Sequence, residues 1–121
     1  MSGIYIQPAP EPSNSAGLAR PGVATLTSQV DYDGRLAALW TPPGGGDAWI
    51  TRIRVNCDVA CTAWVYFNSR TPANLITGTY AGGLDEYDAA QPIWVPDGTK
   101  VLIVWDTQRA VSAHARIEYV R

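Results

Sequence analysis

The chain has 121 residues, of which 46% are hydrophobic and 17% charged, and its formal net charge is −2. A chain of this length supports one domain with a packed core, without the help of a metal or a disulfide framework. The charge is weak and shows no basic stripe, and no apolar run approaches a membrane span, so we expect neither nucleic-acid binding nor membrane insertion.

Residues 1–22 are predicted to form an extended, proline-rich arm that precedes a single domain over residues 23–121. Four prolines lie among small and polar residues without any hydrophobic period: Pro8, Pro10, Pro12 and Pro21. Ile4, Tyr5 and Ile6 form a short apolar patch, and we expect it to lie against the domain or against a neighbouring subunit. No basic region followed by an apolar core marks a secretory signal, so we expect the protein to be made in a cytoplasm.

The first strands are predicted at residues 24–30 and 35–40, where β-branched and other apolar residues accumulate. Between them, Asp31-Tyr32-Asp33-Gly34 is a turn sequence, because Asp-Gly favours the positive φ angles of tight hairpins. A run of prolines and glycines at residues 42–46 then separates these strands from the next one.

Residues 48–68 alternate with a period of two and are predicted to form one hairpin, with residues 58–60 in its loop. The core side of the first strand is expected to carry Trp49, Ile53, Val55 and Cys57, and the opposite side Ile50, Arg52, Arg54 and Asn56. The simplest register places Cys57 opposite Cys61. On the opposite side it makes two cross-strand cation–π pairs, Arg54 with Trp64 and Arg52 with Tyr66.

These four side chains, Arg52, Arg54, Trp64 and Tyr66, form a candidate contact patch, because Trp, Tyr and Arg dominate binding interfaces. The chain has five Trp and six Tyr but only one Phe. The rings of Trp and Tyr are amphipathic, so they suit positions that lie partly in the core and partly on a contact surface. The alternative is that a second sheet covers this face, so that the rings belong to the core. The two cysteines permit a disulfide across the hairpin, although two small buried thiols are the favoured interpretation.

The second half of the chain is predicted to continue as short strands. A strand at residues 75–80 is followed by an acidic loop that contains Asp85, Glu86 and Asp88. Strands at residues 91–95 and 99–106 are joined by the turn at residues 96–98, and the second of them is apolar on both faces, as expected of a central or covered strand. The last strand, residues 110–120, has five inward positions: Val111, Ala113, Ala115, Ile117 and Tyr119. Seven or eight short strands without a helix pattern predict an all-β fold, a single antiparallel β-sandwich that is jelly-roll-like.

No catalytic, cofactor or metal site is predicted. The single histidine, His114, falls on the polar side of the last strand, where an exposed or interface imidazole is favoured over a catalytic one. Zinc would need two ligands beyond Cys57 and Cys61. The carboxylates of Asp85, Glu86 and Asp88 suggest a glycosidase pair or half a calcium site, but an ordinary acidic loop is the favoured interpretation.

A resemblance to small virion proteins of tailed phages, particularly those that infect actinobacteria, extends over residues 48–120. The similar residues lie at 64–68, 74–79, 92–99, 101–105 and 113–119. The resemblance is to a β-sandwich pattern and includes no catalytic signature. It implies a structural role on the virion, as a capsid decoration protein or a minor tail protein, and carries over no functional residues.

The main hypothesis is a non-enzymatic virion structural protein, made in the host cytoplasm, that forms a homo-oligomer and binds other capsid or tail subunits. Its contacts are expected at the arm, through Ile4, Tyr5 and Ile6, and at the aromatic face. The alternative is a carbohydrate-binding module in which Trp64, Tyr66 and Trp94 stack on the sugar rings of a cell-surface glycan. Sequence alone leaves open whether the protein sits on the head or the tail.

Overall fold

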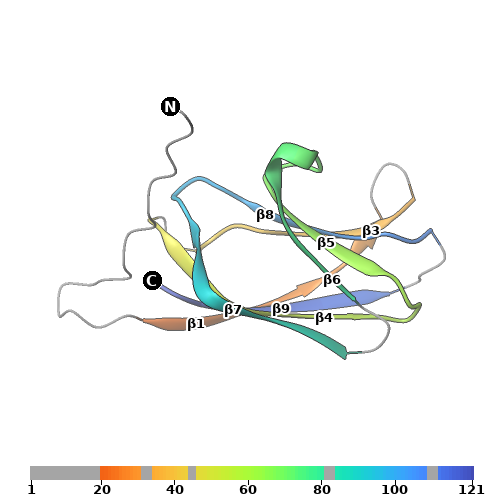
Figure 1. Cartoon of the computed structure of the whole chain (residues 1–121), viewed down its shortest axis with the longest axis horizontal. Helices are drawn as coiled ribbons and strands as arrows, with labels where there is room; N and C mark the ends of the chain where they lie inside the picture. Colours follow the sequence, from red (N-terminus) through yellow and green to blue (C-terminus); the bar gives the residue numbers. More distant parts are fainter. Residues whose placement is uncertain (1–19, 31–33, 44–45, 81–83, 109–111) are drawn as a thin grey trace.

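The computed structural model describes residues 20–30, 34–43, 46–80, 84–108 and 112–121, and it contains two β-sheets packed face to face (Figure 1). The strands are β1 (Pro21–Thr27), β2 (Gln29–Val30), β3 (Leu36–Trp40), β4 (Ala48–Cys57), β5 (Thr62–Phe67), β6 (Leu75–Tyr80), β7 (Leu84–Val95), β8 (Val101–Trp105) and β9 (Ala113–Val120). A short 3-10 helix, η1 (Pro72–Asn74), precedes β6. The described part of the chain has no helix with the length and apolarity that a membrane crossing requires.

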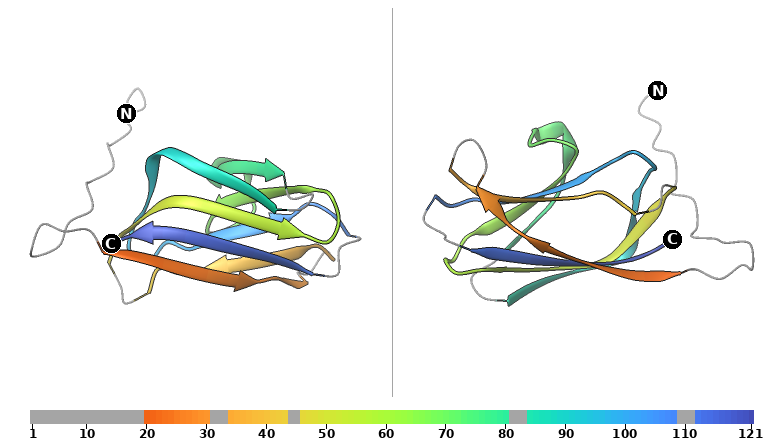
Figure 2. Two further views of the ribbon diagram at one scale, coloured as in Figure 1. Left: turned by 90° about the horizontal axis from the view of Figure 1, so that it is seen from below. Right: turned by 180° about the vertical axis from the view of Figure 1, so that it is seen from behind.

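One sheet has four strands in the order β1-β9-β4-β7, and the other has five in the order β2-β3-β8-β5-β6. All the strand pairs are antiparallel. Figure 2 shows the two layers from below and from behind. The expected antiparallel β-sandwich is therefore confirmed.

The core lies between the sheets and follows the alternation of the strands. In β9, Ala113, Ala115, Ile117 and Tyr119 are buried, as the sequence predicted. Tyr119 packs against Trp40 of β3 across the core, with ring centroids 5.0 Å apart. The predicted central position of residues 99–106 is also correct, because β8 lies between β3 and β5. Val111 lies outside the described residues.

The predicted hairpin at residues 48–68 is wrong. β4 pairs with β7 and β9 in the four-stranded sheet, whereas β5 pairs with β6 and β8 in the five-stranded sheet. Residues 58–61 carry the chain from one sheet to the other. Val55 and Val65 nevertheless face the core, as predicted. A strand alternates between core-facing and outward residues in the same way whether the next strand of the sequence pairs with it or lies in the opposite sheet.

The expected core side of β4 is wrong at the start of the strand, because β4 contains a bulge. The register shifts between Ile50 and Arg52. Even-numbered residues therefore face the core before the bulge, and odd-numbered residues face it after the bulge. Ile50 is fully buried in the core cluster together with Ile53. Trp49, which was expected on the core side, is buried outside that cluster and lies opposite Trp94 of β7.

The turn at residues 96–98 exists, but it does not close a hairpin. The amide of Thr99 donates to the carbonyl of Pro96 at 3.0 Å, and Gly98 has φ +81°, which favours glycine. The strands that it connects, β7 and β8, belong to different sheets. β7 begins at Leu84, so Asp85, Glu86 and Asp88 lie in a strand and not in a loop.

The N-terminal strand begins earlier than expected and is interrupted. Pro21 pairs with Val120 in β1, Ser28 breaks the strand, and β2 then pairs with β3 in the other sheet. The side-chain oxygen of Ser28 accepts from the amide of Ala113 at 3.0 Å, which fixes the break. Residues 1–19, with the predicted patch of Ile4, Tyr5 and Ile6, and the turn residues 31–33 lie outside the described residues.

Candidate functional site

The outer face of the five-stranded sheet is apolar. Two rows of paired residues cross it from β3 to β6: Leu39, Leu102, Tyr66 and Leu75 in one, and Ala37, Val104, Trp64 and Gly78 in the other. Leu39 and Leu75 are 51% and 45% exposed. We call these eight residues the apolar face. They lie on this side because the alternating positions of the same strands, such as Val65 and Ile103, point into the core.

Trp64 is held in place on the apolar face by two contacts. Its ring lies over Gly78 on the neighbouring strand, where a β-carbon would approach the ring to 2.6 Å. Its indole Nε1 donates to Asp106 Oδ2 at 3.4 Å, and Arg35 Nε donates to the other oxygen of the same carboxylate at 2.9 Å. The ring orientation therefore depends on the absence of a side chain at residue 78.

A groove of about 330 Å3 opens at one end of the apolar face, lined by Trp64, Tyr66, Arg70, Thr71, Pro72 and Leu75. Its far wall is the segment around η1, which begins with proline as the first helical residue. The amide of Asn74 donates to the carbonyl of Thr71 at 3.0 Å, and its side-chain amide donates to Ser69 Oγ at 3.1 Å. These bonds hold the partly polar wall of the groove in place. The apolar floor of the groove is formed by Trp64, Tyr66 and Leu75.

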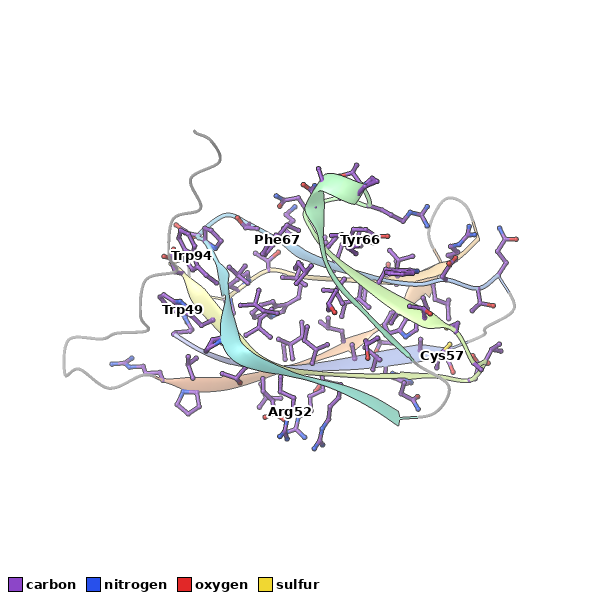
Figure 3. The ribbon with its side chains drawn as sticks, viewed as in Figure 1. Trp49, Arg52, Cys57, Tyr66, Phe67 and Trp94 are labelled. Atoms are coloured by element: carbon purple, nitrogen blue, oxygen red, sulfur yellow. The ribbon has the colours of Figure 1, made fainter. Side chains whose placement is uncertain are left out.

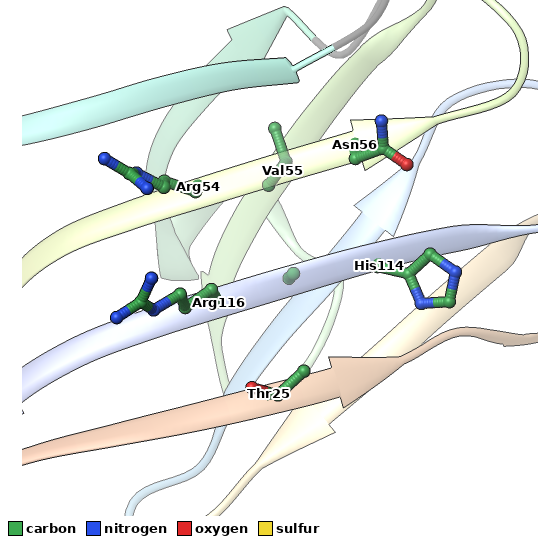
Figure 4. Close-up of a pocket in the computed structure, with 7 residues that line it drawn as sticks. Thr25, Arg54, Val55, Asn56, His114 and Arg116 are labelled. Atoms are coloured by element: carbon green, nitrogen blue, oxygen red, sulfur yellow. The ribbon is translucent and has the colours of Figure 1, made fainter.

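The outer face of the four-stranded sheet is polar. The register places Arg54 opposite Arg116, Arg52 opposite Glu118 and Asn56 opposite His114. Figure 4 shows the first and third of these pairs around a depression of about 200 Å3. Arg116 Nε lies 3.8 Å from Glu118 Oε2, and on β7 the positions opposite Arg52 and Arg54 are Asp88 and Glu86. The arginine and glutamate side chains of β4 and β9 thus give this face charges of both signs.

The predicted contact patch is consequently split between the two sheets. Arg52 and Arg54 lie on the polar face, and Trp64 and Tyr66 lie on the opposite side of the molecule, so the two cation–π pairs are wrong (Figure 3 labels Arg52 and Tyr66). The second sheet packs on the other side of β5. Trp64 and Tyr66 therefore stay half-buried on the outside and do not become core.

Trp94 does not join the two aromatic residues of the groove. It lines a separate depression of about 270 Å3 with Phe67 at the end of the sandwich. Its indole Nε1 donates to Asp47 Oδ2 at 3.0 Å, and the other oxygen of Asp47 accepts from the amide of Asp97 at 2.9 Å. The indole of Trp94 therefore helps to hold the turn between β7 and β8 in place. The groove itself contains two aromatic rings, those of Trp64 and Tyr66.

The two cysteines are free thiols at the passage between the sheets. Cys57 ends β4 and is buried, and Cys61 is half-buried just before β5. Burial raises the pKa of the Cys61 thiol to about 12, with smaller contributions from the hydrogen bond and the charge of Cys57. Little reactive thiolate forms at neutral pH as a result. Among the described residues, no three His, Cys, Asp or Glu side chains gather as a metal site.

Sequence reasoning found Trp64 and Tyr66 but missed Leu39, Leu75 and Arg70. The strand predicted at residues 99–106 carried the available signal, because it is apolar on both sides. Leu102 lies on the apolar face between Leu39 and Tyr66, and Val104 lies on the same side of β8 with only 2% of its surface exposed. No protein-family model, curated protein or solved structure matches the chain.

Proposed function

We propose that the protein is a non-enzymatic structural subunit that assembles with copies of itself through the apolar face. The observation that carries this proposal is the contrast between the two outer faces of the sandwich. One shows half-exposed leucines and aromatic rings in register over four strands, and the other shows charges of both signs. Contiguous apolar surface with few charges is typical of the centre of protein–protein interfaces.

The setting that fits this subunit is the virion of a tailed phage, as a capsid decoration or minor tail protein made in the host cytoplasm. The N-terminal arm and the apolar face would together bind neighbouring capsid or tail subunits. The resemblance over residues 48–120 supports this setting.

The strand connections support a jelly roll as the finer description of the fold. From β3 onward, every connection crosses between the sheets except the one from β5 to β6. The first strand lies beside the last, and the order β1-β9-β4-β7 faces the order β3-β8-β5-β6. Jelly rolls are common among viral capsid proteins and lectins, which agrees with both functions considered for this chain.

Light scattering of the purified protein tests the assembly. The chain has a mass of 13.1 kDa, so a subunit that assembles through the apolar face gives discrete species at multiples of that mass. Their population should rise with concentration, and it should fall when Leu39 is replaced by aspartate. A monomer at every concentration up to the millimolar range would contradict the proposal.

The groove supports a second candidate function, the binding of a carbohydrate. Trp64 and Tyr66 provide two rings for stacking on a sugar, and Arg70 and Thr71 provide polar groups beside them. Titration with soluble cell-wall oligosaccharides, followed by NMR, tests this function. Shifts at the groove that disappear in Tyr66→Ala would support a binding module, and the absence of shifts from the wild-type protein would contradict it.

A further inference from the structure

β1 is an edge strand with little to keep a further strand from pairing with it. Its only partner among the described strands is β9, and the left view of Figure 2 shows β1 at the margin of its sheet. Apart from Pro21 at its start, β1 has none of the features that usually keep an edge unpaired, since it carries no charged side chain and pairs with β9 without a bulge. The other edge strands do have them. β7 contains Asp85, Glu86 and Asp88, β6 pairs with β5 across a register shift, and β2 is two residues long.

Hydrogen bonds at the two ends of β1 show which of its backbone groups face outward. The amides of Arg20 and Arg121 each donate to the carbonyl of the other, at 3.1 and 2.9 Å, and the amide of Ser28 donates to the carbonyl of Ala113 at 3.0 Å. A residue of an antiparallel strand bonds to a given neighbour at every second position, so the even-numbered residues of β1 bond to β9. The odd-numbered residues that follow Pro21 direct their amides and carbonyls away from β9: Val23, Thr25 and Thr27.

The core-facing side of β1 is also incompletely covered. Ala24 and Leu26 pack against the core cluster but are only half-buried at the margin of the sandwich. On the other side of the strand, Val23, Thr25 and Thr27 are exposed. A strand added at this edge would therefore need apolar residues at the positions beside Ala24 and Leu26.

Residues 3–7, Gly-Ile-Tyr-Ile-Gln, have this pattern. Ile4 and Ile6 fall on one side of an extended chain, and Tyr5 falls on the other. The two isoleucines are the only β-branched residues among residues 1–19, and β-branched residues favour strands. Pro8 follows this segment directly.

One antiparallel register satisfies the outward backbone groups of β1. It forms these hydrogen-bonded pairs: Gly3 with Thr27, Tyr5 with Thr25, and Gln7 with Val23. None of the residues that must donate toward β1 is a proline. Pro8 falls opposite Gly22, at a position whose backbone nitrogen points to solvent, so it removes no hydrogen bond from the sheet.

The same register completes the core side. Ile4 lies opposite Leu26 and Ile6 lies opposite Ala24, so both isoleucines extend the core at its open margin. Slipping the segment by one residue would turn both isoleucines to the polar face. The side chains and the backbone groups thus select the same register.

The position of the segment in the chain favours β1 of the same copy. Residues 8–20 join the segment to β1 and hold the two strands at an effective concentration in about the millimolar range. Copies that meet through the apolar face have their four-stranded sheets on the far sides of the pair, because the apolar face belongs to the five-stranded sheet. The β1 strand of such a neighbour is farther away than that of the same chain.

We propose that residues 3–7 pair with the edge of β1 in the same chain and extend the four-stranded sheet by one strand. Residues 8–20 then connect the two strands as a proline-rich loop. The contacts that the proposed function gives to the arm would be made by this loop. The inference itself does not depend on assembly.

NMR spectroscopy of the Leu39→Asp variant tests the inference, because this variant is expected to remain monomeric. Residues of a non-hydrogen-bonded antiparallel pair bring their Cα atoms to about 4.5 Å, so their Hα atoms give strong nuclear Overhauser effects. We expect such effects between Ile6 and Ala24 and between Ile4 and Leu26. The absence of these effects, or effects that join residues 3–7 to a different strand, would overturn the inference. Effects that a mixture of 13C-labelled and unlabelled protein assigns to two different copies would also overturn it.

A matched pair of proline variants of the full-length chain gives a second readout. Tyr5→Pro removes a donor that faces β1, whereas Ser13→Pro places the same residue in the connecting loop. Hydrogen exchange at the amides of Val23, Thr25 and Thr27, measured by mass spectrometry, should be at least about tenfold faster in Tyr5→Pro than in the wild type. Exchange in Ser13→Pro should match the wild type. Equal exchange in the wild type and in Tyr5→Pro would contradict the pairing.

The failure of this inference can be told apart from the failure of the proposed function. If Leu39→Asp disrupts an assembly but residues 3–7 make no contact with β1, only the added strand is refuted. If the wild-type chain remains monomeric and the contacts with β1 are found, only the proposed assembly is refuted.

Discussion

Replacing Leu39 by aspartate should break the proposed assembly without unfolding the subunit. Leu39 lies in the outer row of the apolar face, with 51% of its surface exposed, and it is not part of the core cluster. A carboxylate there keeps contact with water in the monomer, so the free energy of unfolding should fall by only about 1–2 kcal/mol, for the half of the leucine side chain that is buried and for the poor strand propensity of aspartate. In an assembly the same carboxylate would lie against apolar side chains of the next copy.

The magnitude follows from the exposed surface. Full burial of a leucine side chain contributes roughly 1.5–3 kcal/mol, so the half of Leu39 that remains exposed can contribute about 1 kcal/mol to an interface. Burial of an unpaired carboxylate adds a cost of several kcal/mol. Together these terms exceed about 3 kcal/mol for each contact, which corresponds to an association constant more than a hundredfold lower.

Analytical ultracentrifugation over a range of concentrations measures this change, and the chain offers a close control. Val23 is 52% exposed but lies on the polar face, opposite Glu118. Leu75→Asp should weaken association as Leu39→Asp does, whereas Val23→Asp should behave as the wild type. Association that survives Leu39→Asp and is lost in Val23→Asp would refute the assignment of the interface to the five-stranded sheet.

Three further predictions concern single residues. Gly78→Ala should lower the free energy of unfolding by about 1–3 kcal/mol in urea titrations, because its β-carbon would lie 2.6 Å from the Trp64 ring; an unchanged midpoint would contradict this packing. Asp47→Ala should cost about 1–3 kcal/mol in thermal unfolding, because the indole of Trp94 and a turn amide lose their acceptor, and an unchanged Tm would contradict that role. Since the folded pKa of the Cys61 thiol is raised to about 12, its alkylation at pH 8 should be at least about a hundredfold slower than in the unfolded chain. The stability that this thiol contributes is complete below its ordinary pKa of 9.0 and is lost as the pH rises toward 12; equal alkylation rates in both states would contradict this burial.

The sequence predicted the class of fold because alternation and turn chemistry are local. The buried positions of β9 and the break at the proline and glycine run depend only on neighbouring residues. The pairing of strands was not predictable in the same way. Val55 and Val65 face the core in either arrangement, so their pattern does not distinguish a hairpin from two strands in opposite sheets.

A local sequence pattern could not predict the bulge or the apolar face. The register shift after Ile50 is set by pairing with β7 and β9, two strands distant in sequence. The apolar face exists only because Leu39, Leu102, Tyr66 and Leu75, which come from four different strands, fall into one row. Trp64 and Tyr66 were identified as contact residues by their chemistry, but their true neighbours required the topology.

Hydroxyl-radical footprinting of dilute and concentrated protein tests the central claim most directly, since it reports the solvent exposure of individual side chains. If copies meet through the apolar face, oxidation of Leu39, Tyr66 and Leu75 should fall as the concentration rises. Oxidation of Val23 and His114, on the polar face, should stay constant. Protection of Val23 and His114 with no change at Leu39 and Tyr66 would show that copies meet through the other sheet, and would contradict the proposed interface.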